Sequence, residues 1–295
     1  MAVGLTTTGT LSSAAPSIIA DARIVREFDG VWQRTCEMKK LSKGTGLAWQ
    51  EFTLQQIEGA DITEQTINEN PQQYTGVLQS SIPQMSQIMI EVTDRTMEKI
   101  ASVVTSKFGS LAGNAMKRKK DEDYLTLFSG FRTTASPGTG QPLSFGHITA
   151  AVANAISNVT EGAEGEIVAV LHGFQVKDVQ DEILSGIGTY TVPTGMTEDF
   201  FKRGFSGTIA NANVYIDNNI TITSTPDAFG AVHARMGVIA VQGAALKTEM
   251  RRMPDHGGGS DQMFITDDYS FVERTSAGTQ AWCYLIRSDA TAPTS

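Results

Sequence analysis

The stretch TDRTMEKIASVVTSKFGSLAGNAMKRKKDEDYLTLF, residues 93–128, decides the fold because its pattern is that of one long amphipathic helix. Its apolar residues recur three or four positions apart and so line one stripe of the helix. Thr93 or Asp94 is a suitable N-cap, no proline lies within the stretch, and Gly130 is a natural stop. The predicted stripe consists of Met97, Ile100, Ala101, Val104, Phe108, Leu111, Ala115, Tyr124, Leu127 and Phe128.

A helix of roughly 35 residues is about 50 Å long at 1.5 Å per residue, which exceeds the width of a small domain. The sequence therefore predicts a spine helix along which other elements pack. Gly109 and Gly113 each lower helix propensity by about 1 kcal/mol relative to alanine, so two shorter core helices are the alternative.

Composition predicts a soluble globular protein made in the cytoplasm. The 295 residues are 40% hydrophobic, enough to bury a large core. No run of about 18 apolar residues is present, and the first residues lack the basic flank and apolar centre of a signal peptide. Cys36 and Cys283 are far apart and outside any CxxC motif, so we expect free thiols.

The charge of the chain argues against a surface built to grip nucleic acid. The net charge is −9, whereas phosphate binding needs clustered lysine and arginine. One basic cluster, residues 117–120, directly precedes acidic residues 121–123. Such a mixed run is typical of a solvated helix face, and contact with acidic residues of a neighbouring subunit is the alternative.

The N-terminal region is predicted to be an arm that ends in a short helix. Residues 1–20 are small and polar and contain too little apolar bulk to pack alone. Helical spacing of apolar residues follows between positions 24 and 32.

A projecting two-stranded loop is predicted next. Residues 47–54 and 74–79 have strand patterns, and the segment between them is rich in turn formers and acids. A hairpin without a core of its own is marginally stable in water. We therefore expect a neighbouring subunit to cover Trp49, Phe52 and Leu54.

An α/β region follows a linker at residues 133–142, which is rich in Ser, Thr, Gly and Pro. Ser144 is the predicted cap of a helix, and Leu143 is placed to contact Ile148 as a hydrophobic staple. The continuous apolar run at residues 167–171 predicts a buried strand. The other elements expected here are a helix over residues 174–184, which ends at Gly186, and a surface loop between Gly186 and Gly207.

Alternation and turn residues predict strands in the rest of the chain. We expect them to form three consecutive pairs: residues 212–216 with 220–223, residues 235–241 with 246–250, and residues 263–273 with 279–286.

No motif for catalysis or cofactor binding is present. The four histidines lack metal-ligand spacing, so each is expected in the core or at the surface. Residues 204–207 fall short of GxSxG, and no phosphate-binding glycine motif follows a strand. The best candidate for a cation site is the glycine-rich segment 255–261, which Asp255 and Asp261 flank, although a turn between two strands accounts for the same letters.

Several passages, and the order of the parts, resemble one known family. Residues 92–97 (VTDRTM) open the long helix, and residues 119–130 (KKDEDYLTLFSG) form its acidic, leucine-containing end. Later passages are NVYIDNNIT at residues 213–221, Gly230 with Ala231, IAVQGA at residues 239–244, and Glu249. In these passages and in their order, the chain resembles the major capsid proteins of tailed bacteriophages.

The resemblance implies an α+β chain with the HK97-like capsid fold. Its expected parts are an N-terminal arm with a short helix (residues 1–43), an extended two-stranded E-loop (44–81), a peripheral domain with the spine helix (82–135), an inserted axial α/β domain (136–234) and return strands that complete the peripheral domain (235–295).

The same resemblance implies a virion protein, assembled in the host cytoplasm, that forms the hexamers and pentamers of an icosahedral shell around double-stranded DNA. We expect no enzyme activity, cofactor, metal, membrane partner or sequence-specific DNA binding. A separate scaffolding protein is expected because only about forty residues precede the loop, and a portal and cement proteins are further expected partners. A bacterial encapsulin shell has the same architecture and is the alternative. A soluble oligomeric hydrolase or metal-binding protein is the alternative from a different class.

Contacts between subunits are expected at the loop and the spine. Acidic residues of one subunit's loop would pair with lysines of a neighbour's spine. The residues expected at these contacts are Trp49, Phe52, Leu54, Glu58, Asp61, Glu64, Lys117, Lys119 and Lys120.

Overall fold

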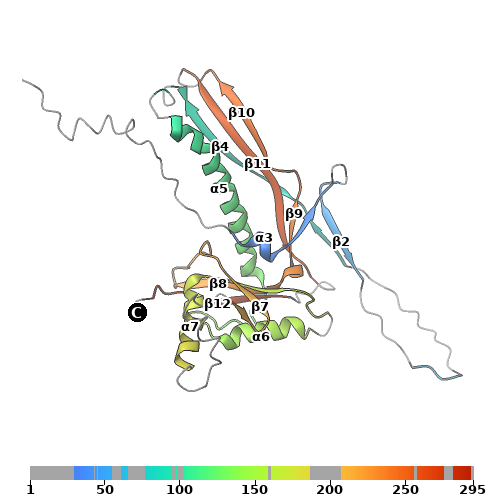
Figure 1. Cartoon of the computed structure of the whole chain (residues 1–295). Helices are drawn as coiled ribbons and strands as arrows, with labels where there is room; N and C mark the ends of the chain where they lie inside the picture. Colours follow the sequence, from blue (N-terminus) through green and yellow to red (C-terminus); the bar gives the residue numbers. More distant parts are fainter. Residues whose placement is uncertain are drawn as a thin grey trace, which may run out of the picture. The chain divides into compact units, whose positions relative to one another are not determined.

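The chain forms two compact units in the computed structural model (Figure 1). Unit 1 includes residues 85–120 and 244–268, and unit 2 includes residues 30–84, 121–243 and 269–295. The described residues are 30–42, 44, 46–54, 61–65, 77–94, 98, 102–158, 161–186, 207–255, 258–275 and 282–293. The side chains of residues 77–78, 102–108 and 183–186 also lie outside the description.

The spine prediction is confirmed over the described part of the helix. Helix α5 spans Ser102–Thr126 without a break at Gly109 or Gly113, and the 3-10 helix η1, Leu127–Gly130, ends at the predicted glycine. The alternative of two shorter helices is therefore wrong for this span. Most of residues 93–101 lie outside the description.

The predicted apolar stripe is wrong in part. Leu111 is 37% exposed, whereas the neighbouring Ala112 and Met116 are buried. Ala115 and Tyr124 are nine residues apart, which is two and a half helical turns, so they lie on opposite faces and cannot share one stripe. The buried side chains on the described part of α5 are Ala112, Met116, Asp121, Tyr124 and Leu125.

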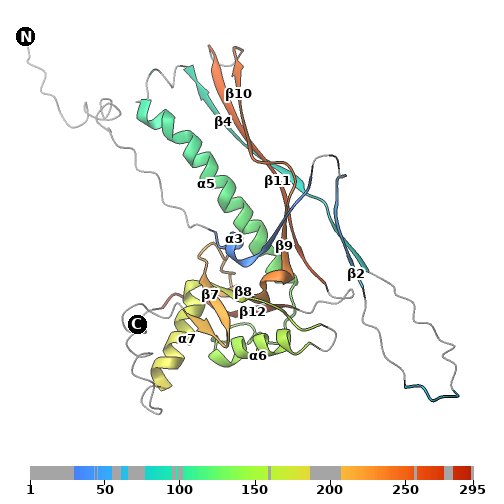
Figure 2. The same cartoon turned by 45° about the vertical axis from the view of Figure 1, so that its right-hand side comes forward.

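Unit 1 is built on strand β11, Ser260–Glu273, whose first residues belong to this unit. It pairs in antiparallel register with β10, Lys247–Met253, and it also pairs with β4, Gln84–Thr93. The unit 1 part of α5 runs beside these strands in both views (Figures 1 and 2). Strand β4 was not predicted: the expected helix starts at residue 93, and no element was expected at residues 82–92.

The larger sheet of unit 2 has the order β12-β8-β5-β7-β6. Strands β5 and β7 are parallel, and the other neighbours are antiparallel. Strand β5 is buried along its whole length, as its continuous apolar run predicted. The strands are β5, Ile167–Leu171; β6, Thr208–Ile209; β7, Ala212–Ile216; β8, Asp227–Ala234; and β12, Cys283–Asp289.

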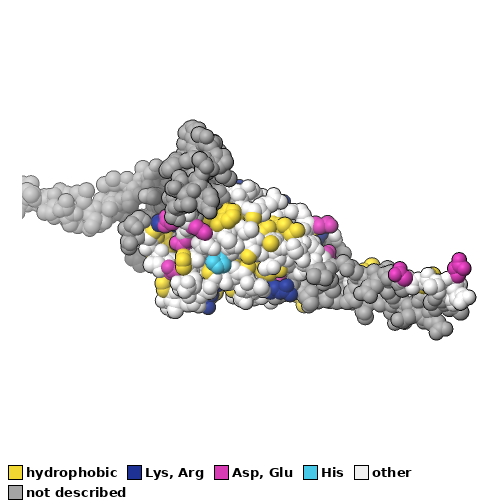
Figure 3. Space-filling view, turned by 90° about the horizontal axis from the view of Figure 1, so that it is seen from below, with side chains coloured by type: hydrophobic (Ala, Val, Ile, Leu, Met, Phe, Trp, Pro, Cys, Tyr) yellow, Lys and Arg dark blue, Asp and Glu magenta, His cyan; other side chains and the backbone are white. Residues whose placement is uncertain are grey.

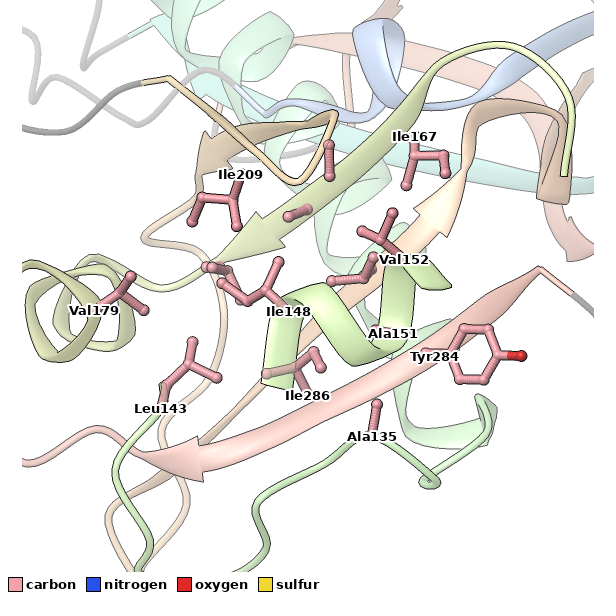
Figure 4. Close-up of a cluster of buried hydrophobic side chains, with 14 of the residues drawn as sticks. Ala135, Leu143, Ile148, Ala151, Val152, Ile167, Val179, Ile209, Tyr284 and Ile286 are labelled. Carbon is pink, nitrogen blue, oxygen red and sulfur yellow. The ribbon is translucent and has the colours of Figure 1, made fainter. Parts of the chain in front are cut away.

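Helices α6, Phe145–Ile156, and α7, Gly173–Gly186, pack with this sheet (Figure 4). The predicted start of α6 is confirmed: Ser144 is its N-cap, and its backbone N–H donates to Nδ1 of His147 at 3.3 Å. Leu143 and Ile148 are both buried in the core beneath the helix, as a staple requires. The predicted end of α7 at Gly186 is also confirmed.

Unit 2 also contains two short helices and two short strands that lie outside this sheet. Helix α3, Trp32–Thr35, leads into β1, Glu37–Lys40, which pairs in parallel with β9, Val238–Gln242. Strand β9 follows the 3-10 helix η2, Arg235–Gly237, and pairs with the last residues of β11.

The strands of the second half were predicted, but their partners were not. Strands β9 and β10 both pair with β11 rather than with each other, and β12 pairs with β8 rather than with β11. Residues 220–223 contribute one isolated bridge, from Ile222 to Ala228, in place of a strand. Alternation identifies a strand by its own residues and carries no information about its neighbour, which is why these predictions were wrong.

Strand β12 also corrects the expected grouping of residues 235–295 as one set of peripheral strands. Five of its seven residues are buried, and it completes the sheet that contains β5. The expected arm at residues 1–20 and the expected loop between Gly186 and Gly207 lie outside the described residues.

The two cysteines are free, as predicted, and both are buried. Burial raises the pKa of Cys36 to about 12 and holds that of Cys283 well above its usual range, so both thiols are unreactive at neutral pH. In the described part of the chain, no helix combines the length and the apolar character needed to cross a membrane.

Candidate functional site

The base of the predicted loop is a two-stranded hairpin in unit 2. Strand β2, Trp49–Thr53, pairs in antiparallel register with β3, Val77–Ser81, so that Trp49 lies opposite Ser81. Strand β2 is visible under its label in Figures 1 and 2. This confirms both predicted strands.

The hairpin exposes large hydrophobic side chains. Phe52 is 60% exposed and Leu54 is 65% exposed, and Leu47 just before the strand is 85% exposed. Trp49 lies on the opposite face of β2 and is half-buried. A row of exposed apolar side chains is typical of a surface that another chain covers.

Arg274 anchors strand β2 to the rest of unit 2. Its Nε and Nη2 donate to the two carboxylate oxygens of Glu51 at 2.8 and 2.9 Å, which is a bidentate pair. Its Nη1 donates to Glu37 at 2.8 Å and to the carbonyl oxygen of Met236 at 2.9 Å. Burial would raise the pKa of Glu37, but hydrogen bonds from Lys39 and Arg274 outweigh it and lower that pKa.

Strand β3 is anchored to the end of β11 and the residues after it. Gln79 donates through Nε2 to the carbonyl of Glu273 and accepts from the backbone N–H of Thr275. The hydroxyls of Ser81 and Ser270 lie 2.8 Å apart. The exposed hydrophobic face is therefore held on a preformed base and does not need a partner in order to form.

The acidic residues predicted at the loop tip are described in part. Asp61 and Glu64 are exposed, which leaves both carboxylates accessible to another chain. Glu58 lies outside the described residues.

The lysines predicted on the spine differ in environment. Lys117 and Lys119 are exposed. Lys120 is not: its side chain is 11% exposed, and its Nζ lies 2.6 Å from Oδ2 of Asp267, whose side chain is 1% exposed. The prediction that the basic cluster at residues 117–120 lies on a solvated helix face is thus wrong for Lys120, which forms an ion pair within its own chain. Asp121, which follows the cluster, is also buried.

The described histidines, at positions 147, 172 and 233, each form hydrogen bonds with the backbone of their own chain. The sequence led us to expect each histidine in the core or at the surface. His147 accepts at the start of α6, and His172 accepts from the backbone N–H of Phe174 at 3.2 Å. His233 is fully buried, and its Nδ1–H donates to the carbonyl of Ala234 at 2.9 Å. Its Nε2 therefore accepts from the hydroxyl of Tyr124, 2.8 Å away.

We predict that His233 makes the chain sensitive to acid. Burial lowers the pKa of His233 from 6.5 to about 4. Between these values the unfolded chain takes up a proton that the folded chain does not, so this group's stabilising contribution falls by about 1.4 kcal/mol per pH unit as pH decreases. The free energy of unfolding should be measured for the wild type and His233→Gln from about pH 7 to about pH 5.

Over that range the wild type should lose about 2 kcal/mol relative to His233→Gln. The comparison removes the contributions of groups that both chains share. A difference between the two chains that does not change with pH would contradict the prediction.

In the segment considered as a cation site, residues 255–261, the carboxylate of Asp261 forms an ion pair with an arginine. Asp261 pairs with Arg252, whose Nη1 lies 3.1 Å from Oδ1, and Arg252 also binds Asp94. The backbone N–H of Asp94 donates to the carbonyl of Gly259, so these contacts join β4 to the β10–β11 turn. Within the described ranges, no group of three or more His, Cys, Asp or Glu is placed to hold a metal ion.

A hollow of about 370 Å³ lies in unit 2. Its lining combines carboxylate, hydroxyl, amide and apolar side chains without a nucleophile beside a base, so it does not suggest a catalytic centre. The lining residues are Glu122, Leu125, Thr126, Ser129, Asn219, Ile220, Thr221 and Phe229.

Helix α6 presents a second apolar surface. It contains no Lys, Arg, Asp or Glu, and Phe145 and Ile156 are 40% and 48% exposed. The view from below shows hydrophobic side chains exposed between polar ones on that face (Figure 3). The hairpin remains the stronger candidate for a contact surface. It has three exposed hydrophobic side chains, at Leu47, Phe52 and Leu54, and the contacts of Arg274 and Gln79 hold its strands in place.

No protein-family model and no curated protein sequence matches the chain. Solved structures do match. The capsid of Ralstonia phage GP4 aligns over 100% of both chains, with a TM-score of 0.67 and 10% identity. The capsid of cyanophage Pam1 aligns over 92% of this chain and 95% of its own, with a TM-score of 0.71 and 8% identity.

A third similar structure is the capsid of Helicobacter pylori bacteriophage KHP30, described as acid-stable. It aligns over 91% of this chain and 94% of its own, with a TM-score of 0.68 and 10% identity. Identities this low carry information about the fold alone. With mixed helices and sheets that align along nearly the whole chain, this protein has the HK97-like fold of phage capsid proteins.

Proposed function

We propose that the chain is a major capsid protein, which assembles as hexamers and pentamers into an icosahedral shell around double-stranded DNA. The observation that carries the proposal is the alignment over the full length of a phage capsid protein, at a TM-score of 0.67. The exposed hydrophobic side chains on the anchored hairpin support it, since a shell subunit needs such surfaces and a monomer does not.

The contact we propose joins the loop of one subunit to the spine of its neighbour. Phe52 and Leu54 would lie against apolar side chains of the neighbour, with Trp49 beneath them. Around this apolar centre, Asp61, Glu64 and Glu58 would face Lys117 and Lys119 of the neighbouring α5. Charge pairs at such a rim orient the partners and weaken with salt. Lys120 is left out of this contact because it binds Asp267.

The shell would enclose DNA without reading its sequence. A net charge of −9 suits a container, because a wall that bound the polyanion tightly would impede its packing and its exit. The proposal includes a separate scaffolding protein, a portal and cement proteins as partners, assembly in the host cytoplasm, and no catalytic activity.

The test is to express the full chain, alone and with the neighbouring structural genes of its source, and to examine the product by sedimentation and electron microscopy. Icosahedral particles that contain DNA support the proposal. Particles that contain an enzyme cargo would identify an encapsulin shell instead. A small closed oligomer with a substrate-sized pocket would overturn the shell function.

We predict that Phe52→Ser impairs assembly without unfolding the subunit. Phe52 is 60% exposed, so the free energy of unfolding should change by less than about 0.5 kcal/mol. Burying this side chain at each contact is worth about 2 kcal/mol, so its loss should weaken each contact roughly thirty-fold. The protein concentration needed for assembly, measured by light scattering, should rise accordingly.

Gln50→Ser is the matched control, because Gln50 lies on the same face of β2 and is polar and exposed. It should leave the assembly threshold unchanged. Equal thresholds for Phe52→Ser and Gln50→Ser would remove the hairpin from the proposed contact.

A further inference from the structure

Two carboxyl groups are buried together in unit 2. Asp121 on α5 is 0% exposed, and Asp217, directly after β7, is 2% exposed. Asn219 connects them, because its Nδ2 donates to Oδ2 of Asp121 at 2.8 Å and its backbone N–H donates to Oδ1 of Asp217 at 2.9 Å. The pair thus joins α5 to the turn that follows β7.

One oxygen of this pair is poorly satisfied. Asp121 Oδ1 is buried and makes no hydrogen bond of good geometry with the described residues, although a backbone hydrogen bond from Trp32 to the Asp121 carboxyl favours its charged form. Two ionised carboxylates side by side in a buried site repel each other, whereas a single proton between them turns the repulsion into a hydrogen bond. Burial, reinforced by the neighbouring Asp217 carboxyl, raises the pKa of Asp121 to about 7.

The carboxyl pair also holds the backbone where the described chain begins. The backbone N–H of Val31 points to Oδ2 of Asp217 at 3.4 Å. A Cβ on Gly30 would lie only 2.2 Å from Oδ1 of Asp121, so the carboxyl lies directly against this glycine. Val31 is therefore hydrogen-bonded to Asp217, and Gly30 packs against Asp121.

The other titratable groups that face the pair are neutral at neutral pH. Burial raises the pKa of Cys36 to about 12 and holds that of Tyr124 well above its usual range. Burial lowers the pKa of His172 in spite of the charge on Asp217. Along α5, Lys120 binds Asp267 and Glu122 is exposed, so the protonation of the pair is decided within the pair itself.

We propose that Asp121 and Asp217 share one proton, and that loss of this proton releases Gly30 and Val31 from α5 and from the turn after β7. A bound cation is the other way to offset two carboxylates. It fits less well, because N–H donors of Val31 and Asn219 already point at the carboxylate oxygens, where a cation would need further oxygen ligands.

The test compares the wild-type full chain, unassembled, with Asp121→Asn, whose amide donates to Asp217 without taking up a proton. The folded wild type keeps a proton that the unfolded chain releases above about pH 4, so its stability is lost as pH rises towards the folded pKa. The folding equilibrium constant of the wild type, relative to the variant, should fall about tenfold per pH unit between about pH 5 and pH 7 and level off above about pH 8.

Hydrogen exchange gives a local readout. After correction for the intrinsic exchange rate, the amide of Val31 should lose protection over the same range in the wild type and keep it in Asp121→Asn. Glu122→Gln, a change at the exposed neighbouring carboxyl, is the matched control and should follow the wild type. A wild type and an Asp121→Asn chain with the same pH dependence would overturn the proposal.

Two further measurements cover the remaining outcomes. If Asp121→Asn does not fold, Asp217→Asn replaces it, and infrared spectroscopy of the wild type should show a protonated carboxyl band that disappears as pH rises through about 7. Absence of that band overturns the proposal. So does a gain in stability from calcium chloride at about pH 8 in the wild type and not in the variant, since it would identify a cation site.

The proton-sharing pair is tested on the isolated chain and does not depend on the shell function. Its consequence for a capsid does rest on that function, because Gly30 lies within residues 1–43, which are expected to form the N-terminal arm and its short helix.

Discussion

Lys120→Ala is expected to lower the free energy of unfolding by about 3–5 kcal/mol. The Nζ of Lys120 lies 2.6 Å from Oδ2 of Asp267, and the Asp267 side chain is 1% exposed. Removing Lys120 takes the positive charge away from a buried carboxylate. The free energy that this costs is larger than the net contribution of the ion pair to stability. Urea unfolding at neutral pH measures the change.

Lys117→Ala is the matched control, because Lys117 is exposed one turn earlier on the same helix. It should change the free energy of unfolding by less than about 0.5 kcal/mol. The double variant Lys120→Met with Asp267→Asn, which removes both charges, should recover much of the loss. If Lys120→Ala is no more destabilising than Lys117→Ala, the ion pair has no role in stability and Lys120 returns to the proposed subunit contact.

Arg274→Ala is expected to undock the hairpin and to destabilise the chain by about 2–4 kcal/mol. Arg274 is 11% exposed and donates to Glu51, Glu37 and the carbonyl of Met236. Alanine removes the cation that Glu51 and Glu37 share, although Glu37 keeps its ion pair with Lys39. The estimate is below that for Lys120 because Glu37 and Glu51 are 33% and 30% exposed, and water screens part of the effect.

Limited proteolysis and urea unfolding test this prediction together. Cleavage in β2 or β3 should be faster in Arg274→Ala than in the wild type. Arg274→Lys should be intermediate, because lysine keeps the charge and loses the bidentate geometry. Arg251→Ala, at an exposed position of β10, serves as the control. Cleavage in the hairpin at the wild-type rate would show that the contacts of β3 are sufficient to hold it.

The helices were largely predictable because their signals are local. Ser144, Leu143 and Ile148 define the start of α6 within a few residues, and the unbroken apolar run at residues 167–171 specifies a strand buried on both faces. The register of α5 was harder to predict, since Lys120 and Asp121 are charged and yet lie on its buried face. Their partners are far along the chain, so spacing alone assigned them to solvent.

The candidate site was predictable only in its exposed part. A polar segment between two strands indicated a loop without a core, and this pointed to Phe52 and Leu54 as contact residues. Nothing near Arg274 signals its role, because Glu51 lies 223 residues earlier. The carboxyl pair of Asp121 and Asp217 was missed for the same reason: each looks like an ordinary surface acid until the fold brings them together.

The separation between Glu51 and Arg274 also has a consequence during synthesis on the ribosome. At about 5–20 residues per second, roughly 10–45 s pass between the translation of Glu51 and that of its partner 223 residues later. Until then the hairpin has strands but lacks its Arg274 anchor. Its hydrophobic face therefore takes up its fixed position only after Arg274 has been translated and has left the ribosome, which delays association of nascent chains through this face.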